Sequence, residues 1–235
     1  MTTFALVHGA WHDAWCWERV APLLERAGHE VLAPQLPSDD GTADFDAYAD
    51  LVCDALGGCD DDVVVVAHSL AGATGALIPD RRPVRHLVYL CAAVPAAGLS
   101  LLDQWQAEPD MVSPEFGSGW LQGLTEPDDQ LRTTWVDLEF ARNVFYADCD
   151  DATATAAIDH LRPQSGYPWT LPCSLSEHPS VGCTSVVCNE DLVVNPSWSK
   201  RVARRIDADI VELPGSHSPF LSQPSAVADV LLRVG

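Results

Sequence analysis

Basic residues are scarce in this sequence. It has 13 Lys and Arg against 34 Asp and Glu, a formal net charge of -21 over 235 residues, and Lys200 is the only lysine. Nucleic acids and anionic membrane surfaces select for positive charge, so this balance argues against both as partners. We therefore expect a small-molecule substrate, and the composition leaves open whether two copies form a homodimer. The bias toward Arg, Ala, Asp and Val is typical of a GC-rich bacterial genome.

Long apolar runs and targeting signals are also missing. No stretch approaches the ~20 apolar residues that a transmembrane helix needs. The N-terminus enters an apolar strand directly, with neither a basic region nor a small-residue cleavage site, so we predict no signal peptide. The eight cysteines are scattered and include no C-x-x-C pair. This pattern is typical of reduced, mostly buried thiols in a cytoplasmic protein, and it argues against a zinc site.

No internal repeat or low-complexity linker interrupts the chain. Strand-like and helix-like segments alternate instead, which is typical of βαβ units and a parallel sheet. The length suits one large α/β domain, with or without an insertion. Predicted strands cover residues 4–8, 29–33, 63–66, 84–91, 183–188 and 209–213, and predicted helices cover residues 45–56, 197–206 and 224–232. Two more helices are expected, one between Pro22 and Gly28 and one directly after Ser69.

Residues 95–181 break this alternation. The stretch is rich in Trp, Pro and acidic residues, and its helical signals fall at residues 139–147 and 151–161. Because strand-like segments resume at residue 183, we interpret it as a small cap inserted between two strands of the sheet. The core domain is then predicted to comprise residues 1–94 and 182–235.

The most informative segment is the junction at Ser69. Four consecutive valines, which favour a strand buried on both faces, lead directly into the sequence Ala-His-Ser-Leu-Ala-Gly at residues 67–72. A serine in a sharp turn between a strand and a helix exposes its hydroxyl at the end of the sheet, close to a helix N-terminus. We therefore predict that Ser69 is a nucleophile. The G-x-S-x-G pattern is not met, however, since Ala67 and Ala71 stand at both glycine positions and add methyl groups to a crowded turn.

An activated serine needs a base within hydrogen-bond reach and a third group that orients the base. In an open α/β sheet, such groups lie beyond the carboxyl ends of the strands. His217 follows the last predicted strand and Asp191 follows the one before it, so we predict that they are the base and the orienting acid. The order Ser69, Asp191, His217 is the one found in hydrolases of this architecture. Glu190, beside Asp191, remains an alternative acid.

The tetrahedral intermediate of such a reaction needs two preorganised backbone N–H donors for its oxyanion. We predict that one is the N–H of Leu70, directly after the nucleophile. The other is expected from Ala10, in the loop after the first strand, where Gly9 leaves room for the backbone to approach the serine.

Three other histidines lie beside these segments. His68 directly precedes the nucleophile, and we expect its side chain to point away as the variable residue of the turn. His8 and His12 flank the loop after the first strand. We interpret these two as organisers of that loop rather than as bases.

The opening H-G-A-W-H-D-A-W-C-W at residues 8–17 resembles the H-G-A-x-H-G-A-W-C-W opening of one branch of the α/β-hydrolase superfamily. That branch contains plant methyl esterases, hydroxynitrile lyases and bacterial esterase-like hydrolases. Residues 67–72 resemble its G-H-S-L-G-G turn, and the resemblance spans nearly the whole chain. It implies a core sheet of about six parallel strands, a small cap and no cofactor. It also implies Ser69 as nucleophile, His217 as base, Asp191 as orienter, and the amides of Ala10 and Leu70 as oxyanion hole.

The sequence departs from that branch in ways that bear on its chemistry. Asp13 replaces the usual glycine of the opening motif and adds a charge near the mouth of the site. Ser218 and Gly9 stand where the lyases carry a lysine and a threonine used in cyanide chemistry. Without that cation a leaving cyanide has little stabilisation, which argues against a lyase.

These observations predict a serine hydrolase that acts on a small, apolar carboxylic ester through an acyl-enzyme. We expect tryptophans of the cap, Trp105, Trp120 and Trp135, to shape an apolar pocket. Two alternatives stay open at this point. The same three side chains could serve a C–C hydrolase or a lyase, or the chain could be a non-catalytic small-molecule-binding homologue, because fold alone does not dictate function.

Overall fold

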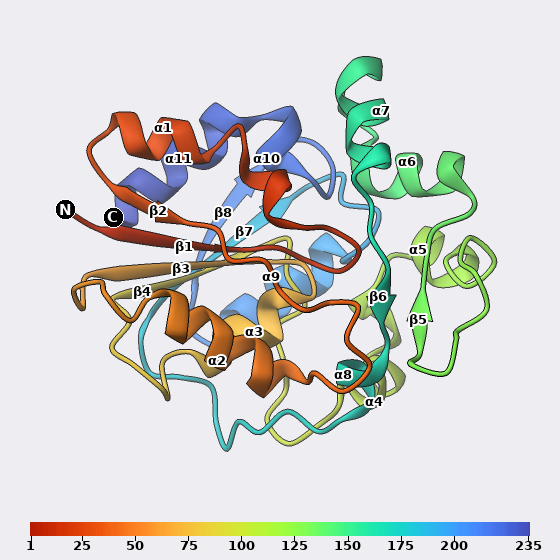
Figure 1. The fold of residues 1–235 in the computed structure, drawn as a ribbon, viewed down its shortest axis with the longest axis horizontal. Coiled ribbons are helices and arrows are strands. Elements are labelled where there is room, and N and C mark those ends of the chain that lie inside the picture. The colour runs from red at the N-terminus through yellow and green to blue at the C-terminus, as the bar shows by residue number, and fades with distance from the viewer.

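A six-stranded sheet forms the centre of the molecule in the computed structural model, which describes residues 1–235 (Figure 1). The strand order is β2-β1-β3-β4-β7-β8, and every neighbouring pair is parallel. The strands are β1 (Thr3–Val7), β2 (Glu30–Leu32), β3 (Val63–His68), β4 (His86–Leu90), β7 (Gly182–Cys188) and β8 (Asp209–Leu213). The predicted α/β fold is therefore confirmed, and each predicted strand exists with bounds shifted by two residues or fewer.

Strand β3 lies in the middle of the sheet because its valines can be buried on both faces. Val63 to Val66 are all 0% exposed, and β3 pairs with β1 on one side and β4 on the other. Helices cover the two faces (Figure 1). Those on one face are α1 (Ala21–Arg26) and α11 (Pro224–Val234), and those on the other are α2 (Phe45–Ala55), α3 (Ala71–Leu77) and α9 (Pro196–Arg205).

The core helices begin and end at the residues that their sequences indicate. Helix α1 has Pro22 in its first turn, and Gly28, with a φ of 91°, follows its end. Helix α2 begins after Asp44, whose carboxylate accepts a hydrogen bond of 2.8 Å from the Ala47 N–H. Its buried face consists of Phe45, Tyr48, Ala49 and Val52, as the apolar spacing predicts.

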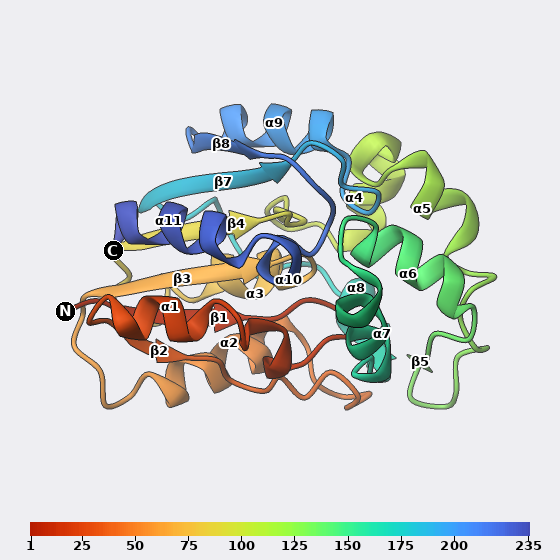
Figure 2. The same ribbon diagram turned by 90° about the horizontal axis from the view of Figure 1, so that it is seen from above.

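The segment between β4 and β7 stands across the carboxyl ends of the strands (Figure 2). We call residues 95–181 the insertion. Its helices are α4 (Leu101–Ala107), α5 (Pro114–Gly119), α6 (Leu138–Tyr146), α7 (Asp151–Asp159) and α8 (Tyr167–Thr170), with a short 3-10 turn η2 (Pro109–Met111). A two-stranded antiparallel ribbon joins β5 (Arg132–Thr133) to β6 (Gln164–Ser165). None of the helices in the molecule has the length and apolar character that a membrane crossing requires.

Only α6 and α7 of the insertion were expected from the sequence. The other elements span a few residues each, too few for an apolar period to repeat. Their starts are instead fixed by single side chains. Ser100 accepts a hydrogen bond of 3.0 Å from the Asp103 N–H at the start of α4, and Ser113 accepts one of 3.0 Å from the Phe116 N–H at the start of α5.

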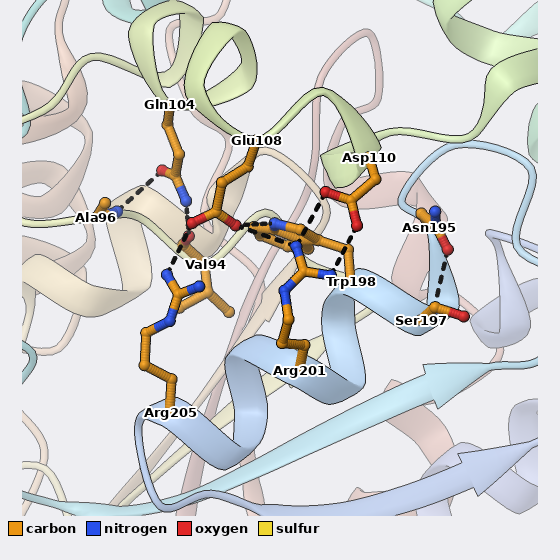
Figure 3. Close-up of polar contacts among 10 residues, drawn as sticks. All are labelled: Val94, Ala96, Gln104, Glu108, Asp110, Asn195, Ser197, Trp198, Arg201 and Arg205. Carbon is orange, nitrogen blue, oxygen red and sulfur yellow. Dashed lines mark hydrogen bonds and ion pairs between the residues drawn. The ribbon is translucent and has the colours of Figure 1, made fainter.

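A cluster of charged side chains ties the start of the insertion to helix α9 of the core (Figure 3). Glu108, between α4 and η2, accepts hydrogen bonds from the indole Nε1 of Trp198 at 2.5 Å and from Arg205 Nη1 at 2.8 Å. Asp110 forms a two-pronged ion pair with Arg201, with N–O distances of 2.7 Å and 2.9 Å. Trp198 is fully buried, so its indole N–H depends on Glu108 for a partner.

Candidate active site

Ser69 sits at the turn between β3 and α3 with a left-handed backbone, φ 54°. Such a conformation is costly for a residue other than glycine, and backbone hydrogen bonds hold it here. The Ser69 N–H donates to the carbonyl of Leu90 at 3.1 Å, and the Ser69 carbonyl accepts from the N–H groups of Gly72 and Ala93, each at 3.0 Å. The neighbouring strand thus fixes the turn that lifts the hydroxyl beyond the end of β3.

The two alanines of this turn fit without opening it. Ala67 and Ala71 are 0% and 2% exposed. A Cβ built on Gly75, about one turn into α3, would lie 2.6 Å from the Cβ of Ala67, closer than real Cβ atoms approach. The methyl group that replaces the expected glycine hydrogen therefore occupies space that Gly75 leaves free.

Ser69, His217 and Asp191 converge above the carboxyl end of the sheet. His217 Nε2 lies 2.9 Å from Ser69 Oγ, and His217 Nδ1 lies 3.0 Å from each carboxylate oxygen of Asp191. Because a carboxylate accepts hydrogen bonds, we assign the imidazole proton to Nδ1, which leaves Nε2 free to accept from the serine hydroxyl. Both His217 and Asp191 are buried, at 0% and 5% exposure.

The carboxylate of Asp191 is itself held by backbone donors. Its Oδ1 accepts hydrogen bonds from the N–H groups of Val193 at 2.8 Å and Val194 at 3.1 Å. Glu190, the alternative acid, is exposed and makes no side-chain contact with His217. The local turn therefore presents Asp191 to the imidazole and leaves its neighbour facing solvent.

The loop that carries Asp191 also pairs with the insertion. Val112 and Val194 form an isolated antiparallel bridge, and the Ser113 N–H donates to the Val193 carbonyl at 2.8 Å. Val112, Val193 and Val194 all face the cavity above Ser69. One pair of backbone segments thus fixes both the acid and part of the cavity wall.

The loop after β1 reaches the serine from the other side. A Cβ on Gly9 would lie 2.7 Å from the Cβ of Ser69 and 2.8 Å from Nδ1 of His68, so this close approach requires glycine. The next residue, Ala10, and Leu70 after the serine both line the cavity beside Ser69. Trp11 then turns the chain with a left-handed φ of 57°. The two residues predicted to supply amide donors therefore flank the serine.

A cavity opens above Ser69 between the core and the insertion. Fourteen of its fifteen lining residues are hydrophobic, and the exception is Ser69. Trp105 and Trp120 line it, as expected, but Trp135 does not. Trp135 is instead packed beneath the wall, with its ring centroid 5.3 Å from that of Trp11. Trp169, in α8, also lines the cavity, although the sequence did not predict it.

The three neighbouring histidines are all buried and each ring contacts a backbone carbonyl oxygen. The carbonyls belong to Gly9 for His8, to Ala10 for His12 and to His217 for His68, with distances of 3.0, 2.8 and 3.0 Å. Burial lowers the pKa of both His8 and His12 to about 4 and that of His68 well below its ordinary value.

The expectation that His68 points away as a variable residue is therefore wrong. Its ring lies against the imidazole of His217, with centroids 4.7 Å apart, and it is 0% exposed. Its Nε2 donates to the backbone carbonyl of His217, the predicted base. No period or motif in the sequence indicates this contact, because 149 positions separate the two residues.

Cys91 lies close to the same constellation. Its sulfur, a carboxylate oxygen of Asp191 and a ring nitrogen of His217 lie within 4.8 Å of one another, a spacing that a metal ion could use. Both carboxylate oxygens of Asp191 already face His217 Nδ1, and Nε2 faces Ser69. The side chains are thus paired with one another in the way that proton transfer needs, and we assign no metal site here.

Comparison with known proteins places this site in context. A profile of the Alpha/beta hydrolase family matches residues 4–230. The chain is 37% identical over 259 residues to a carbendazim hydrolyzing esterase from Nocardioides sp. (strain SG-4G), covering 100% of both chains. It is 27% identical to a pyrethroid hydrolase from Sphingobium wenxiniae, covering 98% of this chain and 86% of that one. The crystal structure of polyneuridine aldehyde esterase superimposes with a TM-score of 0.83 at 23% identity, covering 100% of this chain and 99% of that chain.

Proposed function

We propose that this chain, a carboxylesterase-like member of the α/β-hydrolase family, hydrolyses neutral, apolar esters. Its proposed catalytic residues are Ser69, His217 and Asp191. One observation carries the proposal. His217 Nε2 lies 2.9 Å from Ser69 Oγ, at the base of a cavity whose other lining residues are all hydrophobic. The distance suits proton transfer, and the cavity suits an apolar substrate.

Acylation begins when Ser69 Oγ bonds to the ester carbonyl carbon and passes its proton to His217 Nε2. The carbonyl π electrons move onto oxygen, and the N–H groups of Ala10 and Leu70 donate to this oxyanion. When the carbonyl reforms, the bond to the alcohol oxygen breaks and Nε2 protonates that oxygen. Asp191 stabilises the transient imidazolium through Nδ1–H and stays ionised.

Deacylation repeats these steps with water. His217 Nε2 accepts a proton from water as the water oxygen bonds to the acyl carbon, and the same two amides hold the second oxyanion. The bond to Ser69 Oγ then breaks, and Nε2 returns its proton to that oxygen. The products are the carboxylic acid and the free enzyme.

The cavity lining supports a substrate that is uncharged where it is buried. No lysine, arginine or histidine lines the cavity, so a carboxylate placed there would be desolvated without a partner. Trp105, Phe116, Trp120 and Trp169 offer ring faces and edges to an aromatic acyl or alcohol group. We propose neutral esters with one aromatic portion as the substrate class.

The thiols support a reducing compartment. All eight cysteines are free, and six of them are buried. Free thiols persist in the cytoplasm, where disulfides are kept reduced. We propose a bacterial cytoplasm as the place of action, and recovery of the native protein in a cytoplasmic fraction of its host checks this.

A fluorophosphonate probe tests the proposed chemistry, because it phosphonylates only an activated serine. We expect labelling of the wild type and turnover of para-nitrophenyl butyrate, and loss of both in Ser69→Ala. Ser225→Ala, which changes an exposed serine in α11, is the matched control and should retain both. If the wild type neither reacts with the probe nor turns over aryl esters, the chain is a binding protein. If it cleaves a ketone or a cyanohydrin but no ester, the same residues serve another reaction.

A further inference from the structure

The imidazole of His8 lies between two backbone groups of opposite polarity. Its Nε2 is 3.1 Å from the N–H of Leu36, and its Nδ1 is 3.0 Å from the carbonyl oxygen of Gly9. Since the Leu36 N–H can only donate, Nε2 must accept and the proton must reside on Nδ1. The ring is therefore neutral, with Nδ1–H donating to the Gly9 carbonyl, and it is 0% exposed.

The carbonyl that His8 holds shares its peptide unit with the N–H of Ala10. A peptide unit is planar, so the direction of the Gly9 oxygen fixes the direction of the Ala10 N–H on the opposite edge. Gly9 has no side chain to restrict its own dihedral angles, and glycine tolerates several backbone conformations. Something else must hold this peptide in one orientation, and the hydrogen bond from His8 is placed to do so.

His12 secures the following peptide in the same way. Its Nδ1 is 2.8 Å from the carbonyl oxygen of Ala10, and its Nε2 is 2.8 Å from the hydroxyl of Tyr146. Ala10 thus joins two peptide units whose oxygens both accept from buried imidazoles, and its N–H belongs to the first of them. A carbonyl that accepts a hydrogen bond also polarises the N–H of its own peptide unit, which strengthens that N–H as a donor.

We propose that His8 is a positioning residue for ester hydrolysis, which aims the Ala10 N–H at the oxyanion by anchoring the Gly9 carbonyl. This inference rests on the proposed function. The role differs from that of a base, because His8 never exchanges a proton with the substrate. It also differs from a purely structural tie between loops, because only the Nδ1 side of the ring acts on catalysis.

Two substitutions separate these roles. In His8→Asn the side-chain amide nitrogen can take the place of Nδ1 and donate to Gly9, but nothing reaches Leu36. In His8→Gln the amide oxygen can take the place of Nε2 and accept from Leu36, but the Gly9 carbonyl loses its donor. Loss of one oxyanion donor lowers kcat by roughly 10²–10³-fold, so we expect a fall toward this range in His8→Gln with little change in KM. His8→Asn should retain most of the wild-type kcat.

A trifluoromethyl ketone supplies the second readout, since Ser69 adds to it and forms an anionic hemiketal. Its inhibition constant should rise in His8→Gln in proportion to the loss of kcat/KM, whereas the binding of an uncharged ester analogue that forms no adduct should not change. If His8→Gln retains kcat while His8→Asn loses it, the tie to Leu36 is what matters and the inference is wrong. Thermal unfolding of both variants gives the folded fraction to which kcat is normalised.

One measurement uses the wild type alone, so it does not depend on whether the variants fold. Nitrogen-15 NMR of the wild type distinguishes the two imidazole tautomers of His8, and we expect the proton on Nδ1. A proton on Nε2 would overturn the inference. Active wild-type enzyme with an unaffected His8→Gln variant also rejects it while the proposed function stands. Wild-type protein that turns over no ester rejects the proposed function itself.

Discussion

Gly75 and Ala67 are complementary across the turn that holds Ser69: a Cβ at position 75 would come within 2.6 Å of the Ala67 Cβ. We expect Gly75→Ala to lower the free energy of unfolding by about 1–3 kcal/mol through overpacking, partly offset by the better helix propensity of alanine. The double variant Ala67→Gly/Gly75→Ala should recover most of this loss. Urea unfolding of the two single variants and the double variant, taken as a double-mutant cycle, measures the coupling. Additive effects would show that the two positions are independent.

The contact between Asp191 and His217 predicts a second result. Asp191→Asn replaces a carboxylate that accepts from Nδ1–H with an amide that can stabilise the wrong tautomer of the base. We expect kcat to fall roughly ten-thousand-fold, with the fold retained. Glu190→Gln is the matched control, because Glu190 is exposed and adjacent in sequence, and its kcat should equal that of the wild type. Equal losses in both variants would contradict the assignment of the acid.

The tryptophans of the insertion differ in what they contact. Trp169 lines the cavity, whereas Trp135 is 4% exposed and lies behind the wall. Trp169→Ala should raise KM for a naphthyl ester roughly tenfold, because a ring contact is lost, and leave phenyl acetate nearly unaffected. Trp135→Phe should leave both KM values unchanged while lowering the unfolding temperature. A shift of KM in Trp135→Phe alone would contradict the assignment of Trp169, and not Trp135, to the cavity wall.

We expect Glu108 and Asp110 to contribute unequally to the free energy of unfolding, although both bind arginines of α9. Glu108 also accepts from the buried indole of Trp198, and Glu108→Ala leaves that donor without a partner. We expect a loss of about 1–3 kcal/mol in the free energy of unfolding. Asp110→Ala removes only an exposed ion pair with Arg201, which is worth at most about 1 kcal/mol and is screened by salt. Chemical unfolding in low and high salt compares the two variants, and equal losses would contradict this account.

Buried neutral histidines predict a loss of stability in acid. The pKa values of His8 and His12 are lowered from 6.5 to about 4. The unfolded chain therefore takes up protons at these residues below pH 6.5 that the folded chain does not accept until pH about 4. The two histidines therefore leave the free energy of unfolding unchanged above about pH 6.5. As the pH falls from 6.5 toward 4, each of them lowers this free energy by on the order of 1 kcal/mol or more.

Urea unfolding across this pH range measures the slope. His12→Gln should make it shallower, whereas His160→Gln, which alters an exposed histidine, should leave it unchanged. A free energy of unfolding that is flat with pH in the wild type would show that these rings take up protons as readily in the folded protein as in the unfolded chain.

The sheet and the order of the proposed catalytic residues were accessible from the sequence because both depend on local signals. A run of valines predicts a strand buried on both faces, and small residues around Ser69 predict a sharp turn. His217 and Asp191 follow from the same rule, since parallel strands bring their carboxyl ends to one edge. Each of these inferences needs only a few consecutive residues and one general property of α/β sheets.

The cavity wall and the buried imidazoles were not accessible in this way. Trp169 and Trp135 are both aromatic residues of the insertion, and only the packing of short elements decides which one faces the cavity. His68 contacts the carbonyl of His217, 149 positions away. Gly75 compensates for Ala67 only because α3 packs back on β3. No sequence motif predicts that these two residues approach each other.

The backbone bridge between Val112 and Val194 limits how this enzyme can change its selectivity. Cap grafting between relatives treats the insertion as a module that is cut at its two ends. Here one residue of the bridge, Val112, lies in the insertion, and the other, Val194, lies in the loop that carries Asp191. A transplanted cap must therefore either carry a sequence that re-forms this pairing or bring residues 191–195 with it. Otherwise Asp191 will no longer be held against the imidazole of His217.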